Sequence, residues 1–74
     1  MFSGERLKAI RKDRRLTLAQ LSEVSGLSRT ALSRLETDKI NLNTQSLIAL
    51  CISLKTRPEV LFGSRKAYHA FFRK

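Results

Sequence analysis

The stretch LTLAQLSEVSGLSRTALSRLE, residues 16–36, decides the fold of this 74-residue chain. Thr17 and Gln20 have the spacing of a capping box, in which the Thr side chain accepts from the Gln20 backbone while the Gln20 side chain reaches back. Gly26 tolerates the positive φ that a turn of two or three residues often requires. Ser28 can cap a second helix. The sequence therefore predicts a short helix through Val24, a tight turn, and another short helix.

Two such helices, joined by a three-residue turn that contains glycine, make a helix-turn-helix. Their apolar residues would fix the angle between the helices: Leu21, Leu27, Leu32 and Leu35, with Ala19 and Ala31 as further members of the buried sides. The second helix, over 29–36, would present its polar residues outward: Arg29, Thr30, Ser33 and Arg34. This polar side is either merely solvated or a surface that contacts a partner.

Helical patterns also flank this stretch. Ser3 can cap a first helix that ends near Arg15, with Leu7 and Ile10 on one side. The loop after the second helix of the motif is polar apart from Ile40 and Leu42, which would anchor it. Asn43 or Thr44 can cap a fourth helix, in which Leu47, Leu50, Cys51 and Leu54 form a continuous core stripe.

Pro58 suits the first position of a short fifth helix, PEVLF, because its missing N–H would be unpaired there. Gly63 then indicates a stop, before a basic and aromatic tail at 64–74 that could form a sixth helix. No segment has a strand pattern. We therefore expect an all-α, compact five-helix domain at 1–63 and a separate tail.

The charge of the chain favours a polyanionic partner. Fifteen Lys and Arg against six Asp and Glu give a formal net charge of +9, a strong field on so small a body. Residues 1–16 hold six bases and two acids, and residues 64–74 hold four bases and no acid. Both ends are basic and the middle is nearly neutral.

Several classes of function are excluded by what the chain carries. The single Cys51 and the single His69 are too few for a zinc site, and the scattered carboxylates form no recognisable metal or catalytic set. We expect no metal, no cofactor, no small-molecule ligand and no enzymatic activity. No apolar run approaches a membrane span, and the N-terminus lacks the apolar core of a signal peptide, so a cytoplasmic protein without membrane contact is expected.

Across residues 5–62 the chain resembles the lambdoid phage repressor and Cro helix-turn-helix family, also called the xenobiotic-response-element type. Besides residues 16–36, the resemblance is carried by RLKAIRKDRRLT, which is similar to the family's first helix, and by LIALCISLKTRPEVLF, which is similar to its last two. The resemblance implies a lambda-repressor-like fold whose third helix enters the major groove of double-stranded DNA.

The resemblance also implies the residues that contact DNA. The family's base-reading positions fall on Arg29, Thr30 and Arg34, with Ser33 adjacent, and Arg29 is the best candidate because a guanidinium can donate two bonds to guanine. The matching phosphate contacts are Thr17, Ser28, Lys39, Asn41 and Asn43. Ser and Thr caps are equally explained by helix energetics.

Other family positions are structural, and three depart from the pattern. Arg11 and Glu36 match an ion pair that links the first helix to the third. Leu18 stands where many members carry a phosphate-contacting Gln. Asp38 and Lys55 stand where a helix-ending Gly is common, and the Asp38 charge disfavours phosphate, which puts the path of that loop in question.

The resulting expectation is a sequence-specific transcriptional regulator, a repressor or autoregulator, that binds a palindromic operator as a homodimer. A single reading helix covers few base pairs, so proteins of this plan usually pair. The resemblance suggests Arg57, Pro58 and Val60 as pairing residues. The aromatic residues of the tail are a second candidate, or they pack back on the chain's own core: Tyr68, Phe71 and Phe72. With no second domain expected after residue 74, control would come from concentration, DNA affinity or another protein. An open alternative is a DNA-binding antitoxin, or another interaction module, whose tail binds a partner protein.

Overall fold

The computed structural model describes residues 2–63, and within this range the chain forms five helices and no strand. The helices are α1 (Gly4–Asp13), α2 (Leu18–Ser25), α3 (Arg29–Glu36), α4 (Thr44–Leu54) and α5 (Pro58–Phe62). The all-α fold with five helices is therefore confirmed. The predicted sixth helix, with Tyr68, Phe71 and Phe72, lies outside the described residues.

The helices begin at the residues that the caps predict. In α1 to α4 the side chain of the preceding residue accepts a hydrogen bond from the backbone of the first turn; these residues are Ser3, Thr17, Ser28 and Asn43. Of the two candidates for α4, Asn43 makes the cap, and its Oδ1 accepts from Ser46 N at 2.7 Å. Pro58 is the first residue of α5, as predicted.

Three helices end with a non-glycine residue at positive φ. Arg15, Asp38 and Lys55 have φ values of 58°, 58° and 51°. In each case the following N–H bonds back by five residues, as in Leu16 N to Arg11 O at 3.2 Å, which is the Schellman pattern that closes a helix. Because Arg15 turns the chain in this way, α1 ends at Asp13, earlier than the predicted end near Arg15.

The core is built almost entirely of leucine. Its fully buried side chains are Leu7, Leu21, Leu32, Leu35, Leu47, Leu50, Leu54 and Leu61. Cys51, predicted as a member of the α4 core stripe, is only half-buried, and Ala19, predicted as buried, is exposed on the outer side of α2. In the loop before α4 only Leu42 is buried, while Ile40 is exposed.

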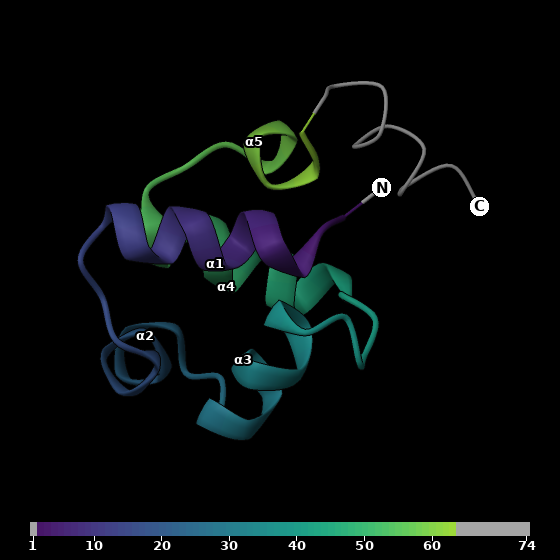
Figure 1. Ribbon diagram of the computed structural model, residues 1–74. Helices are drawn as coiled ribbons and strands as arrows, with labels where there is room; N and C mark the ends of the chain where they lie inside the picture. Colours follow the sequence, from purple (N-terminus) through teal and green to yellow (C-terminus); the bar gives the residue numbers. More distant parts are fainter. Residues whose placement is uncertain (1, 64–74) are drawn as a thin grey trace.

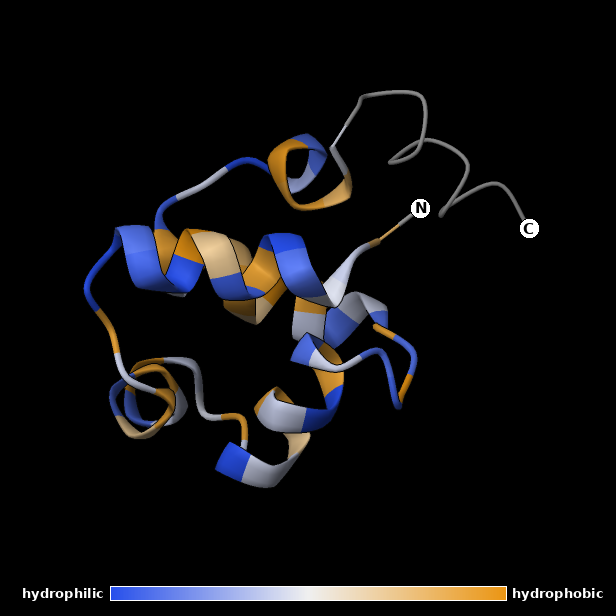
Figure 2. Ribbon diagram, viewed as in Figure 1, coloured by the Kyte–Doolittle hydropathy of each residue, from blue (hydrophilic) through white to orange (hydrophobic). Residues whose placement is uncertain are grey.

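The packing leaves α3 at one extremity of the domain. Helix α1 packs against α3 and α5, and α2 packs against α3 and α4. In Figure 1, α5 lies at the top and α3 at the bottom, with α1 between them. Figure 2 shows that the first turn of α3, lowest in the view, begins with a hydrophilic residue. No helix within residues 2–63 combines the length and apolar character that crossing a membrane needs.

Candidate nucleic-acid interface

Side-chain caps and one glycine set where α2 begins and ends and where α3 begins. The capping box that starts α2 is complete, since Gln20 N donates to Thr17 Oγ1 at 3.1 Å and Thr17 N donates to Gln20 Oε1 at 2.9 Å. Gly26 ends α2 at φ 77°, and no atom lies within 4 Å of where its Cβ would be, so conformation alone explains the glycine. The turn then delivers Ser28, whose Oγ accepts from Ala31 N at 3.0 Å.

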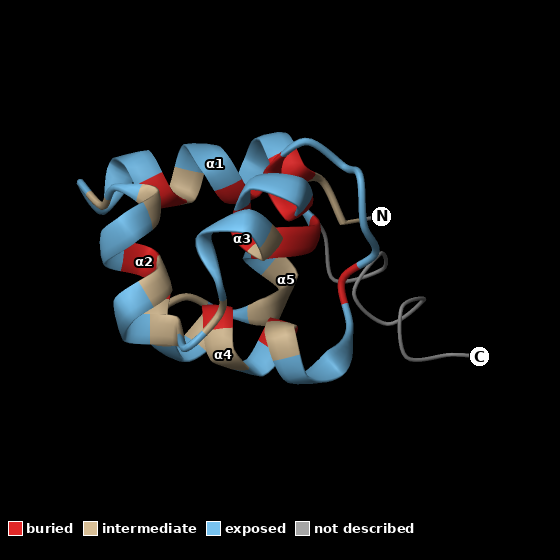
Figure 3. Ribbon diagram, turned by 90° about the horizontal axis from the view of Figure 1, so that it is seen from below, coloured by how far each residue is buried: buried red, intermediate tan, exposed pale blue. Residues whose placement is uncertain are grey.

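One side of α3 is in the core and the other is in solvent. Leu32 and Leu35 are buried. The predicted base-reading residues are all exposed: Arg29, Thr30, Ser33 and Arg34. Figure 3 views the domain from below and shows exposed residues along the near side of α3. The start of α3 is therefore available for contact.

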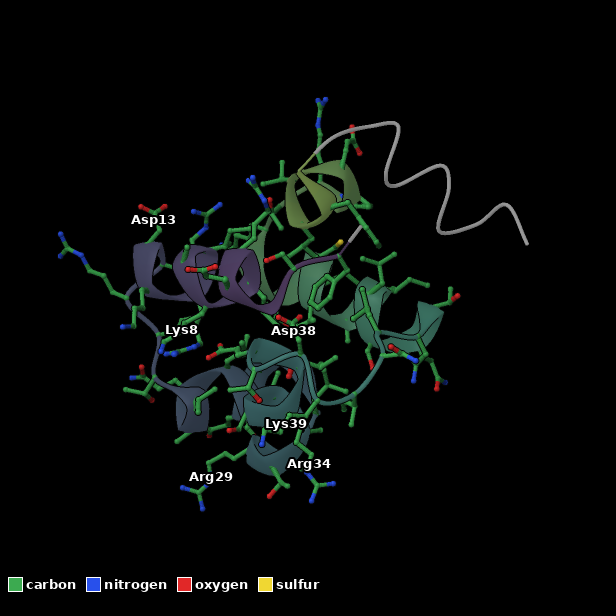
Figure 4. The ribbon with its side chains drawn as sticks, turned by 45° about the vertical axis from the view of Figure 1, so that its right-hand side comes forward. Lys8, Asp13, Arg29, Arg34, Asp38 and Lys39 are labelled. Atoms are coloured by element: carbon green, nitrogen blue, oxygen red, sulfur yellow. The ribbon has the colours of Figure 1, made fainter. Side chains whose placement is uncertain are left out.

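The carboxylates of α3 and of the turn that follows it are both bonded elsewhere in the domain. Glu36, the only acidic residue of this helix, is buried and lies 2.6 Å from Arg11 Nε. The next acidic residue, Asp38, accepts a hydrogen bond from Gly4 N and lies between α3 and α1 in Figure 4. Arg29 and Arg34 point away from the domain in the same view. The outer side of α3 is therefore cationic.

The predicted phosphate contacts lie at helix starts and in one loop. Thr17, Ser28 and Asn43 are exposed residues that precede α2, α3 and α4. Each already accepts a bond from its own helix, so helix energetics explains these residues fully. The remaining two, Lys39 and Asn41, are exposed in the loop between α3 and α4. In Figure 4 the Lys39 side chain lies on the same side of the domain as Arg29 and Arg34.

Leu18 stands at a position where many members of the resembled family carry Gln. Its side chain is half-buried and packs against the leucine core. Its side chain therefore serves packing. It has no polar group with which to contact a phosphate oxygen.

The candidate pairing residues differ in their exposure. Arg57 is exposed and makes no side-chain cap, Pro58 is half-buried, and Val60 is 42% exposed. Two residues of α4 that sequence reasoning missed are more exposed than Val60: Ile48 at 54% and Ile52 at 71%. They stand one turn apart, and their position outside the Leu47–Leu50–Leu54 stripe is the signal that could have revealed them.

Cys51 is the only thiol and is half-buried on α4. Burial, and secondarily the Glu59 carboxylate, raises the pKa of the Cys51 thiol. A raised pKa keeps the thiol protonated and poorly nucleophilic at neutral pH. Within residues 2–63, no three His, Cys, Asp or Glu side chains are grouped so as to hold a metal ion.

The fold and the exposed start of α3 define a helix-turn-helix protein. The chain matches the family described as "Helix-turn-helix" over residues 7–61, and it belongs to that family. The family consists of DNA-binding transcriptional regulators, which are not enzymes.

Individual relatives agree with this assignment. The chain is 40% identical over 63 residues to the immunity repressor protein of Bacillus phage phi105, a match that covers 85% of this chain and 44% of that repressor. The chain thus spans less than half the length of this relative. Among solved structures, it is similar to the restriction-modification controller protein C.AhdI from Aeromonas hydrophila, with 29% identity, a TM-score of 0.77, and coverage of 80% of this chain and 89% of that one.

It is also similar to the P22 c2 repressor in complex with synthetic operator 9T, with 33% identity and a TM-score of 0.75. This match covers 82% of the present chain and 92% of the P22 chain.

Proposed function

We propose that this protein is a sequence-specific regulator of transcription that binds double-stranded DNA by inserting the start of α3 into the major groove. The observation that carries the proposal is the outer side of α3, where Arg29 and Arg34 are exposed while Glu36 is buried and paired. A helix of about 10–12 Å diameter fits a groove about 12 Å wide. A cationic helix side attracts the phosphates on either side of that groove.

In this proposal the base-reading residues are those at the start of α3 and one turn further on. Arg29 is the first residue of α3, and its planar guanidinium can donate to O6 and N7 of one guanine. Thr30 offers a hydroxyl or a methyl group to the next base. Arg34 lies one turn further along, with Ser33 beside it, and reaches a base or a phosphate.

Phosphate contacts would hold the helix in register. The starts of α2, α3 and α4 carry Thr17, Ser28 and Asn43, and helix starts attract phosphate because their N–H groups and dipoles are positive. Lys39 and Asn41 would add contacts from the loop. These contacts are independent of base sequence, so they set affinity more than specificity.

We further propose that two copies pair and read a palindromic site. Two chains with a formal charge of +9 repel each other, so they need a contact surface with few charges. Helix α4 has no ionisable residue except Cys51 and exposes Ile48 and Ile52. Together with Arg57, Pro58 and Val60 of the α5 region, these residues form the candidate pairing surface. The similar P22 c2 repressor was solved in complex with a synthetic operator, which supports DNA binding by this fold.

The sense of regulation that we propose is repression, because two similar proteins are named repressors: the immunity repressor of Bacillus phage phi105 and the P22 c2 repressor. A protein that acts on DNA in this way would work in the compartment that holds the DNA, the cytoplasm.

Selection of bound DNA from a random double-stranded pool tests the proposal. We expect one enriched half-site with a G opposite Arg29, repeated as an inverted pair about one helical turn apart. A pool that stays unenriched although protein is bound would reject sequence-specific reading. Enrichment of a single, unrepeated half-site would reject the pairing of two copies and leave sequence-specific reading intact.

A further inference from the structure

Asp38 links the end of α3 to the start of α1. The backbone N–H of Gly4, the first residue of α1, donates to Asp38 Oδ1 over 2.9 Å, across 34 positions of sequence. A carboxylate is favoured at a helix start, where unpaired N–H groups and the helix dipole are positive. Asp38 therefore holds a long-range contact in addition to its place in the turn.

The contact requires that the two backbones approach closely. A Cβ at Gly4 would lie 2.6 Å from the carbonyl carbon of Glu36, and closer still to Leu35 O. Only glycine leaves room for α1 to begin directly against the end of α3. This approach brings the Gly4 N–H within reach of the Asp38 carboxylate.

The turn at Asp38 separates two side chains of opposite charge. Asp38 has φ 58°, and the next residue, Lys39, donates its N–H to Arg34 O at 2.8 Å. In Figure 4 the Asp38 side chain lies toward α1, while Lys39 lies on the side of Arg29 and Arg34. The acidic neighbour of Lys39 is thus held away from the cationic side of the domain.

We infer that Asp38 is a positioning residue for DNA binding: its bond to Gly4 fixes the loop after α3 so that Lys39 faces the phosphates. Glycine could adopt the same φ but has no side chain to bond with α1. The hydrogen bond between Gly4 N and Asp38 restrains the turn after α3, and it directs the carboxylate away from the phosphates. The inference rests on the proposed function, because it needs a DNA contact at Lys39.

Four variants test the inference: Asp38→Gly, Asp38→Asn, Lys39→Ala and the double variant Asp38→Gly/Lys39→Ala. Binding to a duplex with the selected site, and to an unrelated duplex, is measured over a range of salt concentrations and well below each unfolding midpoint. Measuring at a temperature well below the unfolding midpoint keeps every variant folded, so a loss of stability alone does not change the measured binding.

We expect Lys39→Ala and Asp38→Gly each to weaken binding to both duplexes by about fivefold, and each to reduce the salt slope by about one unit. The double variant should be no weaker than Lys39→Ala, because both changes remove the same contact. Asp38→Asn keeps an oxygen acceptor and should bind at least as tightly as the unchanged chain. The coupling between positions 38 and 39 is a result that a merely structural role would not produce.

Three outcomes would overturn the inference while leaving the proposed function intact: Asp38→Gly binding as tightly as the unchanged chain, fully additive losses in the double variant, or an equal loss in Asp38→Asn. If the unchanged protein binds neither duplex, the proposed function itself fails.

Discussion

The guanidinium of Arg11 contacts both carboxylate oxygens of Glu36, through Nε at 2.6 Å and Nη2 at 3.2 Å. Its third nitrogen, Nη1, donates to Leu16 O at 2.7 Å. One buried side chain of α1 is therefore bonded both to the last residue of α3 and to the link before α2. The three helices that define the candidate interface share this connection.

Glu36→Gln should destabilise the domain by about 3–5 kcal/mol, because it leaves the buried Arg11 charge without a counter-charge. Chemical denaturation followed by far-UV circular dichroism measures the loss. Lys12→Gln, which removes an exposed charge one position from Arg11, is the matched control and should change stability by less than about 0.5 kcal/mol. Similar values for the two variants would contradict a structural role for the pair.

Lys55→Gly should stabilise the domain by about 1 kcal/mol. Lys55 follows α4 with φ 51°, a region that costs non-glycine residues roughly 1–2 kcal/mol, partly offset by the greater unfolded-state freedom of glycine. The change in denaturation midpoint measures the gain. Lys12→Gly, inside α1, provides the contrast and should destabilise by about 1 kcal/mol. A loss of stability in Lys55→Gly would mean that its side chain contributes more than the strain costs.

Arg29→Lys should lower the preference for the selected site over unrelated DNA and leave the affinity for unrelated DNA almost unchanged. Lysine keeps the charge but cannot donate two parallel bonds to one guanine, so the preference for the selected site over unrelated DNA should fall by about 1–3 kcal/mol. Competition binding with the two duplexes measures it. Arg6→Lys makes the same replacement at an exposed position of α1 and should leave the preference intact. Equal effects from both variants would remove Arg29 from the base-reading set.

Cys51 should react slowly with iodoacetamide at pH 8 in the folded protein, and the rate should rise with pH through a midpoint above that of an unfolded thiol. Burial and the Glu59 carboxylate raise the pKa of this thiol, so folding favours its protonated form. This contribution to stability is present below the unfolded pKa and is lost as pH rises through the folded pKa. Glu59→Gln should shift the reaction midpoint slightly downward, because burial is the larger cause. A midpoint equal to that of the unfolded chain would contradict the effect.

Much of the fold follows from local rules that the sequence displays. Side-chain caps such as Thr17 and Asn43, and the glycine turn at Gly26, set helix boundaries within a few residues. Helix α1 ends at Asp13, slightly before the predicted end near Arg15, because Arg15 adopts a positive φ that its side chain does not signal. The exposure of Arg29 follows from periodicity, since Leu32 and Leu35 point into the core.

Contacts between residues far apart in the sequence could not be predicted from these local rules. Asp38 stands out in the sequence as a departure from glycine, yet its carboxylate accepts a hydrogen bond from Gly4 N, 34 positions away. That partnership depends on how closely α1 approaches α3, a tertiary property. The hydrophobicity of Ile52 does not distinguish it from a core residue, and only its place outside the Leu47–Leu50–Leu54 stripe indicates its exposure.

Ile52→Lys should weaken self-association by at least tenfold, because it places a charge on the most exposed apolar side chain of α4, in a protein that already repels its copies. Sedimentation equilibrium without DNA measures the effect, and the variant should bind a single half-site as the unchanged chain does. Ile40→Lys adds the same charge at an exposed apolar residue of the loop before α4 and should leave self-association nearly unchanged. Equal weakening by both variants would show that net charge alone controls pairing. No weakening by Ile52→Lys would move the pairing surface away from α4.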